Sequence, residues 1–291
     1  MGEMKVVAII NMKGGVAKTT TVRNMAYVMW HRFGKKVLVV DSDESGSLSD
    51  GFERRPEIEP GVPYNGIAKL MVEDNCTVRD VIVHTNYDGI DIIPANGTVG
   101  AAKKVLLGES GKISSHYIFQ KKIAEVKNDY DYCLVDCTPD SNLLEENILL
   151  ASHEVIIPSE IDTDSIDRAA TTKLSLDEVR SYATTTPVFL RGILFTKVEY
   201  SSMDRQGLLE EYPASFPVFD TFIRKSVIAK QSRNQCICCS EFSPKATISI
   251  DYDNFVAEFL HEPLPHAKGA SRKKLREEEY QKQLEHEQQR K

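Results

Sequence analysis

The sequence has no long hydrophobic run and no sign of a secretion signal. A membrane-spanning helix needs roughly 18 or more consecutive apolar residues, and no stretch of the 291 residues approaches that length. The first residues, MGEMKVVAII, contain an acidic residue and lead straight into an apolar segment, without a basic start or a small-residue cleavage site. These absences predict a cytoplasmic protein that does not associate with membranes.

Cysteine is too scarce for a disulfide framework. The chain has 6 cysteines, and in the cytoplasm they would remain reduced thiols. Cys236 and Cys239 have a C-x-x-C spacing, but two thiolates hold a metal only with further ligands from elsewhere in the chain or from a second copy. Structural or incidental thiols are the favoured interpretation, a metal site is the alternative, and Cys238 beside them has no predicted role.

Basic residues do not dominate the composition. The chain has 36 Lys and Arg against 43 Asp and Glu, a formal net charge of -7 at pH 7, which argues against a protein coated in basic residues. Residues 221–245 depart from this balance, because Glu241 is their only acidic residue. This segment is either a solvated face or a phosphate-binding patch. The candidate contacts to duplex DNA are Arg224, Lys225, Lys230 and Arg233.

Short apolar runs alternate with amphipathic segments. Nearly unbroken apolar runs are typical of strands that are buried on both faces of a parallel sheet. The runs are residues 5–10, 36–41, 89–94, 130–136, 153–158 and 189–196. Between the first two, apolar residues recur at helical spacing from Val22 to Phe33, and Gly34 closes this predicted helix. The pattern predicts an α/β fold with a doubly wound, mostly parallel sheet flanked by helices.

Two segments fall outside this pattern. Residues 51–66 combine proline, glycine and charge, and we expect a surface excursion there. Residues 265–291 are highly charged with few apolar residues, which is typical of a solvated helix or a disordered tail. We therefore expect one domain over residues 1–264, followed by a charged C-terminal segment.

The segment NMKGGVAKTT, residues 11–20, joins the first predicted strand to the first predicted helix. A glycine-rich turn that opens a helix binds phosphate, because free backbone N–H groups and the positive end of the helix dipole point at the anion. Lys18 is expected to reach the β and γ phosphates, and the Thr19 hydroxyl to bind Mg²⁺. Met12 and Ala17 replace both glycines of the common pattern G-x-x-x-x-G-K-[ST], and Ala17 would be strained if its position requires a positive φ.

Three segments carry a family resemblance. KGGVAKTT resembles the deviant Walker A motif, K-G-G-x-G-K-[ST], of the ParA/MinD group of P-loop ATPases. VLVVDSDESGSLS resembles the family's D-x-D-P-Q-G segment through Asp41 and Asp43, although the Pro-Gln pair is replaced. YDYCLVDCTPD resembles the Walker B segment, in which Asp136 matches the acid associated with Mg²⁺. The similarity covers about residues 4–260 and is strongest to the short ParA/Soj type.

The resemblance implies an ATPase with ATP and Mg²⁺ as cofactors. By resemblance, Lys13 reaches across a dimer interface to the partner's phosphates, while Thr19 holds Mg²⁺ together with Asp136, the latter through water. Asp41 would support the ion from a second layer, and Asp43, in the loop after its strand, is placed to orient the attacking water. The predicted ATP-binding residues are Lys13, Gly14, Gly15, Val16, Ala17, Lys18, Thr19 and Thr20, of which Lys13 and Lys18 are counted with Asp43 as catalytic.

The implied function is DNA partitioning. A ParA-type ATPase forms a homodimer around ATP, binds duplex DNA nonspecifically on the nucleoid, and is released when a ParB-like adaptor stimulates hydrolysis. The alternatives are a MinD-like positioner, for which Leu275, Tyr280 and Leu284 give the tail too little apolar surface, and an iron-sulfur carrier of the Mrp type. In that type the cysteine pair follows the strand that ends here at Thr196, one strand before Cys236. The cargo and the partner stay open.

Overall fold

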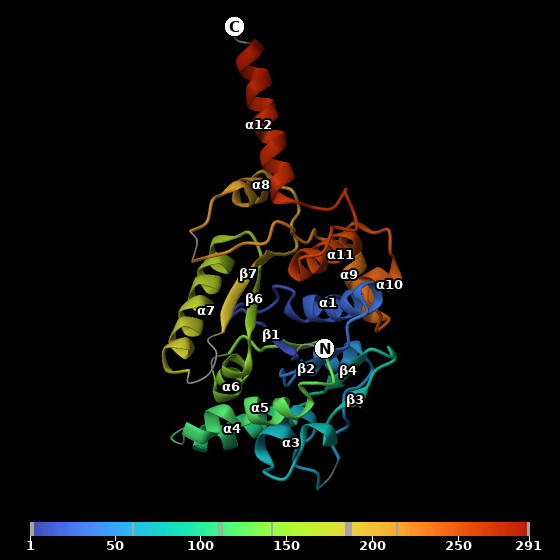
Figure 1. Cartoon of the computed structure of the whole chain (residues 1–291), viewed down its shortest axis with the longest axis vertical. Coiled ribbons are helices and arrows are strands. Elements are labelled where there is room, and N and C mark those ends of the chain that lie inside the picture. The colour runs from blue at the N-terminus through green and yellow to red at the C-terminus, as the bar shows by residue number, and fades with distance from the viewer. Residues whose placement is uncertain are drawn as a thin grey trace.

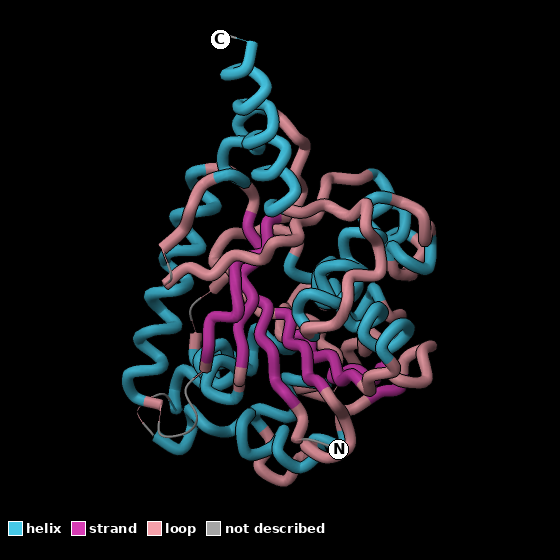
Figure 2. The backbone as a smooth tube through the Cα atoms, turned by 45° about the horizontal axis from the view of Figure 1, so that its top comes forward, coloured by secondary structure: helices cyan, strands magenta, loops and turns pink. Residues whose placement is uncertain are grey.

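The computed structural model describes residues 3–289 except 60, 110, 112, 141, 184–187 and 214. At its centre lies a 7-stranded sheet in the order β3-β4-β2-β5-β1-β6-β7 (Figures 1 and 2). Neighbouring strands are parallel except at the edge, where β3 runs antiparallel to β4. The strands are β1 (Lys5–Ile9), β2 (Val37–Asp41), β3 (Val83–His84), β4 (Ile90–Ile93), β5 (Tyr132–Asp136), β6 (Glu154–Ser159) and β7 (Phe189–Phe195). The doubly wound α/β prediction is confirmed.

Each predicted apolar run forms a strand, because its side chains are covered from both faces of the sheet. β2 is buried along its whole length, and β1 is buried from its second residue onward. The edge strand β3 was not predicted. It has only two residues, Val83 and His84, and both are exposed, so no apolar run marks it in the sequence.

Helices cover both faces of the sheet and enclose two hydrophobic cores. One core lies between the sheet and α1, α10 and α11, and the other between the sheet and α3 to α7, which Figure 1 labels. The helices are α1 (Lys18–Phe33), α2 (Ser47–Gly51), α3 (Gly66–Val72), α4 (Thr98–Glu109), α5 (Ile118–Ile123), α6 (Leu143–Ala151), α7 (Thr163–Tyr182), α8 (Ser202–Leu209), α9 (Val227–Asn234), α10 (Cys239–Phe242), α11 (Thr247–Leu260) and α12 (Arg272–Gln289), with short 3-10 helices at Val78–Asp80, Ile113–Tyr117 and Ala124–Val126.

The first helix follows the predicted pattern. α1 begins at Lys18, directly after the glycine-rich loop, and ends at Phe33. Gly34 adopts a left-handed conformation with φ 61, and its N–H donates to the Trp30 carbonyl at 3.0 Å. Glycine is the residue that accepts this conformation without strain, so the predicted helix end is confirmed.

The C-terminal segment is helical and projects from the body (Figure 1). Its start is packed, because Ala270 and Leu275 are buried in the core that contains α3 to α7. Arg272 is also buried, and its guanidinium donates to the carbonyls of Leu208 and Glu210, both at 2.8 Å. Packing therefore continues past the boundary expected at residue 264. Within the described residues, no helix combines the length and the apolar character needed to cross a bilayer.

Candidate nucleotide-binding site

The glycine-rich loop lies at the carboxyl end of β1, where the next strands of the sheet also end. Gly15 has φ 80 and Ala17 has φ 68, so the position that lacks the family glycine does require a left-handed backbone. For a residue with a Cβ this conformation costs roughly 1 kcal/mol. Val16 between them is buried, and its carbonyl accepts a hydrogen bond from the Thr196 hydroxyl at 3.1 Å. This contact ties the loop to the end of β7.

Lys18 is held inside the loop. Its side chain is buried, and Nζ donates to the carbonyls of Asn11 at 3.1 Å and Lys13 at 3.2 Å. Burial lowers the pKa of Lys18, and the nearby Asp136 carboxylate opposes this shift. The ammonium group is therefore held against the loop carbonyls at the edge of the cavity, where it can contact a phosphate bound by the loop N–H groups.

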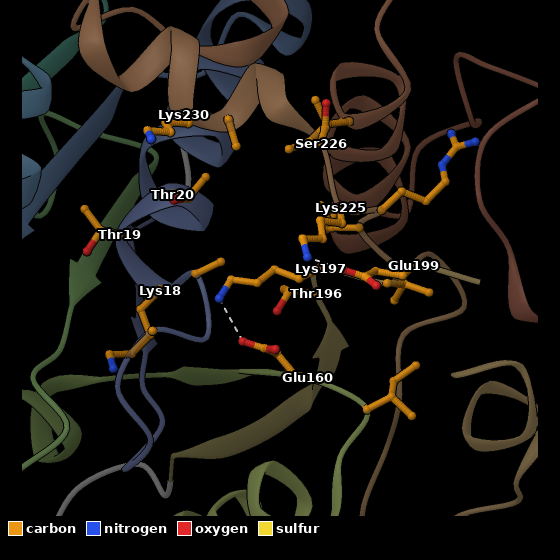
Figure 3. Close-up of a pocket in the computed structure, with 18 of the residues that line it drawn as sticks. Lys18, Thr19, Thr20, Glu160, Thr196, Lys197, Glu199, Lys225, Ser226 and Lys230 are labelled. Carbon is orange, nitrogen blue, oxygen red and sulfur yellow. Dashed lines mark hydrogen bonds and ion pairs between the residues drawn. The ribbon is translucent and has the colours of Figure 1, made fainter. Parts of the chain in front are cut away.

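A cavity of about 830 Å³ opens in front of this loop (Figure 3). Its walls include Gly14, Gly15, Ala17, Lys18, Thr19 and Thr20 from the predicted ATP-binding set. Val16 points into the core, and Lys13 lies beyond the cavity wall. The opposite wall comes from segments that follow β7, including Thr196, Lys197, Val198 and Ile223.

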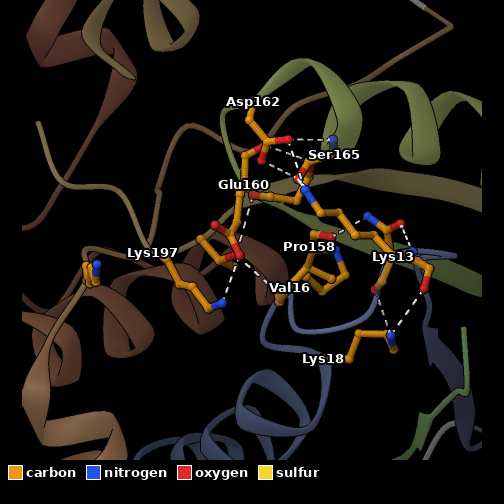
Figure 4. A network of polar contacts seen from close by, with 12 residues as sticks. Lys13, Val16, Lys18, Pro158, Glu160, Asp162, Ser165 and Lys197 are labelled. Carbon is orange, nitrogen blue, oxygen red and sulfur yellow. Dashed lines mark hydrogen bonds and ion pairs between the residues drawn. The ribbon is translucent and has the colours of Figure 1, made fainter. Parts of the chain in front are cut away.

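Lys13 is engaged within its own chain. Its Nζ lies 2.9 Å from Asp162 Oδ1, 2.8 Å from Ser165 Oγ and 3.1 Å from Asp164 Oδ2, all at the start of α7 (Figure 4). The hydrogen bond with Asp162 is the largest cause that raises the pKa of Lys13. Sequence patterns did not reveal this contact, because Asp162 is 149 residues away. Lys13 must leave it before it can reach a phosphate of another subunit.

Two buried carboxylates end adjacent strands beside the loop. Asp41 on β2 and Asp136 on β5 are register partners. Neither side-chain oxygen of Asp136 has a hydrogen-bond partner among the described residues, although this residue is only 1% exposed. Burial and the Asp41 carboxylate raise the pKa of Asp136, while Thr19 and Lys18 act in the opposite direction.

Asp136 and Thr19 are suited to hold a magnesium ion. Mg²⁺ prefers hard oxygen ligands and usually retains several waters, and a buried carboxylate with both oxygens unpaired is suited to hold such waters. The Thr19 hydroxyl lies at the start of α1, close enough to Asp136 to lower the pKa of its carboxyl group. Thr19 and Asp136 are thus the residues that would hold the ion beside the phosphate loop.

Asp41 anchors the loop that follows β2. Its Oδ1 accepts from the Asp43 N–H at 3.1 Å, and its Oδ2 accepts from the Ser49 N–H at 2.9 Å and the Ser49 hydroxyl at 2.7 Å. Burial raises the pKa of Asp41 to about 6 despite these bonds. Asp43 lies in the loop itself, lines the large cavity, and accepts from the Ser45 N–H at 2.9 Å. Asp41 therefore positions the predicted catalytic residue Asp43.

Glu145 was missed by sequence analysis. It lies on α6, is 2% exposed, and its Oε1 accepts from the Thr138 hydroxyl at 2.6 Å and the Thr138 N–H at 3.1 Å. Burial raises the pKa of Glu145 to about 7. The contact joins α6 to the loop after β5, just beyond Asp136. The only local signal for it was a carboxylate in the first turn of a mainly apolar helix that Asn142 caps.

The predicted basic patch divides into two parts. Arg224 pairs with the buried Asp251 at 2.6 Å, and Lys225 pairs with Glu199. Lys230 and Arg233 on α9 are exposed, and neither has an ion pair within the described part of the chain. All four line the large cavity. Arg224 and Lys225 thus already have carboxylate partners, whereas Lys230 and Arg233 present uncommitted charges among these four residues, and the contacts to DNA stay a prediction.

The cysteines do not assemble a metal centre among the described residues. Cys238 and Cys239 are buried, and Asn24 on α1 accepts a hydrogen bond from the Cys239 N–H at 2.7 Å. Burial raises the pKa of Cys238 to about 12, so this thiol stays protonated. The structure supports the interpretation of these thiols as packing groups.

Known proteins resemble this chain over most of its length. Residues 4–183 match a family described as "AAA domain". The sporulation initiation inhibitor protein Soj of Bacillus subtilis is 30% identical over 225 residues, which is 77% of this chain and 85% of that protein. The chromosome-partitioning ATPase Soj of Treponema pallidum is 27% identical over 259 residues, 88% of this chain and 97% of that protein.

A solved structure has the same arrangement of elements. Cobyrinic acid a,c-diamide synthase from Mycobacterium smegmatis, with a bound ATP analog and magnesium, is 25% identical and has a TM-score of 0.72. The alignment covers 89% of this chain and 95% of that one. This likeness agrees with the fold, and the ligands named for that structure are consistent with ATP and Mg²⁺ as cofactors.

Proposed function

Because the chain belongs to the ParA/MinD-type P-loop ATPases, we propose that it is a DNA-partitioning ATPase of the ParA/Soj type. Its cofactors are ATP and Mg²⁺. In this proposal the protein dimerises around ATP, binds duplex DNA nonspecifically on the nucleoid, and leaves the DNA when a ParB-like adaptor stimulates hydrolysis. Two Soj relatives, one of them named as a chromosome-partitioning ATPase, support this choice.

The observation that carries the proposal is the unpaired Asp136 carboxylate beside the Lys18 loop. When bound, Mg²⁺ neutralises phosphate charge, and phosphoryl transfer needs this neutralisation more than covalent catalysis. Lys18 and the loop N–H groups bind the phosphates, Thr19 and Asp136 hold the ion, and Asp43 orients the attacking water. Each of these side chains lines the cavity or ends a strand at its floor.

Dimer formation is proposed to depend on Lys13. Its present partners, Asp162, Asp164 and Ser165, lie at the start of α7, and Asp162 also lines the rim of the cavity. A lysine at this place carries positive charge outward from its own loop, where a second subunit would bring its phosphates. Exchange of carboxylate partners for a phosphate would couple subunit association to ATP.

DNA binding is proposed to use Lys230 and Arg233. Both are exposed on α9 and line the cavity that holds the nucleotide loop. Positive charges next to the nucleotide site would allow ATP-dependent association to control contact with DNA phosphates. Such contacts are electrostatic and sequence-independent, so the affinity is expected to fall with salt at a log-log slope of about -0.9 per phosphate neutralised.

The test measures binding of duplex DNA without nucleotide, with ADP, with ATP and with a nonhydrolysable ATP analogue. Wild type should bind only in the ATP states. Lys230→Glu combined with Arg233→Glu should abolish DNA binding and preserve ATP binding. The matched control, Lys104→Glu with Lys121→Glu, makes the same charge change on exposed residues of α4 and α5 beyond the other face of the sheet.

The same matrix separates the alternative functions. DNA binding that is equal in all nucleotide states would contradict the partitioning proposal. ATP-dependent sedimentation with anionic liposomes, without DNA binding, would favour a membrane positioner. A visible absorption band that depends on Cys236 and Cys239 after anaerobic reconstitution with iron and sulfide would favour an iron-sulfur carrier.

A further inference from the structure

Arg23 is a buried cation without a counter-charge. It lies on α1, one turn after Thr20, and is 3% exposed. Its Nε has no hydrogen-bond partner, and none of the ion pairs among the described residues includes it. Removing a charge from water without a partner is strongly unfavourable. The guanidinium therefore requires an explanation that packing within the chain does not provide.

The surroundings of Arg23 make room for the guanidinium but do not neutralise it. Gly51 of α2 packs against it so closely that a Cβ there would lie 3.0 Å from Nη1. The groups that sense its charge from the segment of α10 and from α11 are the thiols of Cys238 and Cys239 and the phenol of Tyr252. Burial raises the pKa of each, and the positive charge of Arg23 only opposes this rise. All three are protonated and neutral at physiological pH.

Arg23 lines the same cavity as the phosphate loop, together with Lys230 and Arg233 of α9. Figure 3 shows Lys230 and Thr20 bordering this cavity. Thr20 and Ser47 also line it, and the Ser47 hydroxyl lies 3.0 Å from the Ser45 hydroxyl. The three cations have no carboxylate partner among the described residues. Together with two nearby hydroxyl groups, they offer the hydrogen-bond donors that a phosphate group requires.

We propose that Arg23, Lys230 and Arg233 form a second phosphate-binding subsite, separate from the phosphate loop. Because Arg23 follows Thr20 by three helical residues, the subsite lies about 4.5 Å further along the α1 axis. Its ligand is a phosphate group other than those of ATP, carried either by a small phosphorylated molecule or by the DNA backbone. This inference goes beyond the partitioning function and holds whether or not the protein moves DNA.

The test fills the phosphate loop first. The full-length protein is saturated with a nonhydrolysable ATP analogue and Mg²⁺, and is then titrated with inorganic pyrophosphate or, separately, with a short duplex DNA. Arg23→Met should weaken the binding of at least one probe by about tenfold or more, since a hydrogen bond to a charged group is lost. Loss with pyrophosphate identifies a small-molecule subsite, and loss with DNA alone identifies a backbone contact.

Thermal unfolding without ligand separates a binding role from a structural one. Arg23→Met removes an unpaired buried charge, so it should unfold at the same temperature as wild type or higher. Arg32→Met on the same helix is the matched control, because Arg32 pairs with the buried Asp253 at 2.6 Å. This control should unfold at a lower temperature and bind both probes normally. Arg23→Lys keeps the charge without the planar fork, and should bind with intermediate affinity.

Three outcomes would overturn the inference. If the Arg23→Met variant unfolds at a lower temperature than wild type and still binds both probes, Arg23 has a structural role. Weaker binding of the ATP analogue itself, with no second site in wild type, would assign Arg23 to the ATP site. If Arg23→Met does not fold, unchanged probe binding in Lys230→Gln with Arg233→Gln, which alters only exposed residues, would exclude the subsite. If wild type shows no nucleotide-dependent DNA binding but still binds pyrophosphate, the partitioning function is rejected and the phosphate subsite is retained.

Discussion

Release of Lys13 from its intrachain partners should strengthen ATP-dependent dimerisation. We expect this from Asp162→Asn, which removes the carboxylate that lies 2.9 Å from Lys13 Nζ. In the proposed dimer Lys13 contacts the phosphates of the other subunit. Every contact that Lys13 makes within its own chain therefore opposes association. The substitution removes one such contact from the monomer and none from the dimer interface that we propose.

The size of the effect follows from the exposure of the pair. The side chains of Lys13 and Asp162 are 26% and 39% exposed, so water screens their attraction. Partly exposed ion pairs contribute about 0.5–1 kcal/mol each. Because both subunits of the dimer lose one such pair, the dissociation constant of the dimer should be about five- to thirtyfold lower at about 0.59 kcal/mol for RT. Asp164 and Ser165 remain beside Lys13 and keep the effect in this range.

Sedimentation equilibrium with ATP and Mg²⁺ measures this constant. In Asp162→Asn the new amide keeps a side-chain oxygen that can accept from the Ser165 N–H, so the start of α7 stays capped. Asp162→Ala loses this cap as well and serves as the comparison for helix stability. In a Lys13→Ala background, Asp162→Asn should have no effect, because the two residues then no longer interact. Unchanged or weaker dimerisation of Asp162→Asn alone would refute the competition between the two contacts.

Further predictions concern the loop and the carboxylates around it. Lys18→Ala should neither bind ATP nor dimerise, as measured by calorimetry and size-exclusion chromatography; a defect confined to DNA would contradict its role. Ala17→Gly should raise the unfolding free energy by up to about 1 kcal/mol in urea titrations, because φ 68 strains an alanine. Asp43→Ala should accumulate as an ATP dimer without turnover. Burial raises the pKa of Glu145 from 4.5 to about 7, so this group should cost wild type at most about 3 kcal/mol of stability as the pH rises between these values. Glu145→Gln should lose less stability over this range, and the remaining loss should come from Asp41 and Asp136, whose pKa values burial also raises.

Local patterns were sufficient to predict six of the seven described strands and the position of the glycine-rich loop. Apolar runs indicate strands that are buried on both faces of the sheet. The spacing of Gly15, Lys18 and Thr19 indicates a phosphate-binding loop, because all of its residues lie within ten positions of the sequence. Asp41 and Asp136 were also predictable as neighbours, because parallel strands bring their carboxyl ends to one edge. The prediction succeeded wherever the relevant partners are adjacent in sequence or adjacent by the rules of a parallel sheet.

Contacts between distant segments could not be predicted in this way. In the sequence Arg224 lies in a basic stretch and suggests an unpaired cation. In the structure it pairs with Asp251, which lies on α11. Nothing in the sequence around Arg23 indicates burial, but this residue is 3% exposed and Gly51 of α2 packs against it. In both cases the outcome depends on which side chains of other elements approach, and the pattern of a single segment carries no information about that approach.

The buried charges of the site are arranged by sign. Asp41 and Asp136 lie on the side of the loop formed by β2 and β5, and their raised pKa values show that the protein alone stabilises their ionised forms poorly. Lys18 and Arg23 lie on α1, where burial lowers the pKa of Lys18 and Arg23 has no carboxylate partner among the described residues. A polyanion alone would relieve only the basic side, and a metal ion alone only the acidic side. A magnesium-bound nucleotide carries both charges, so binding it as one unit recovers stability that the fold gives up on each side of the loop.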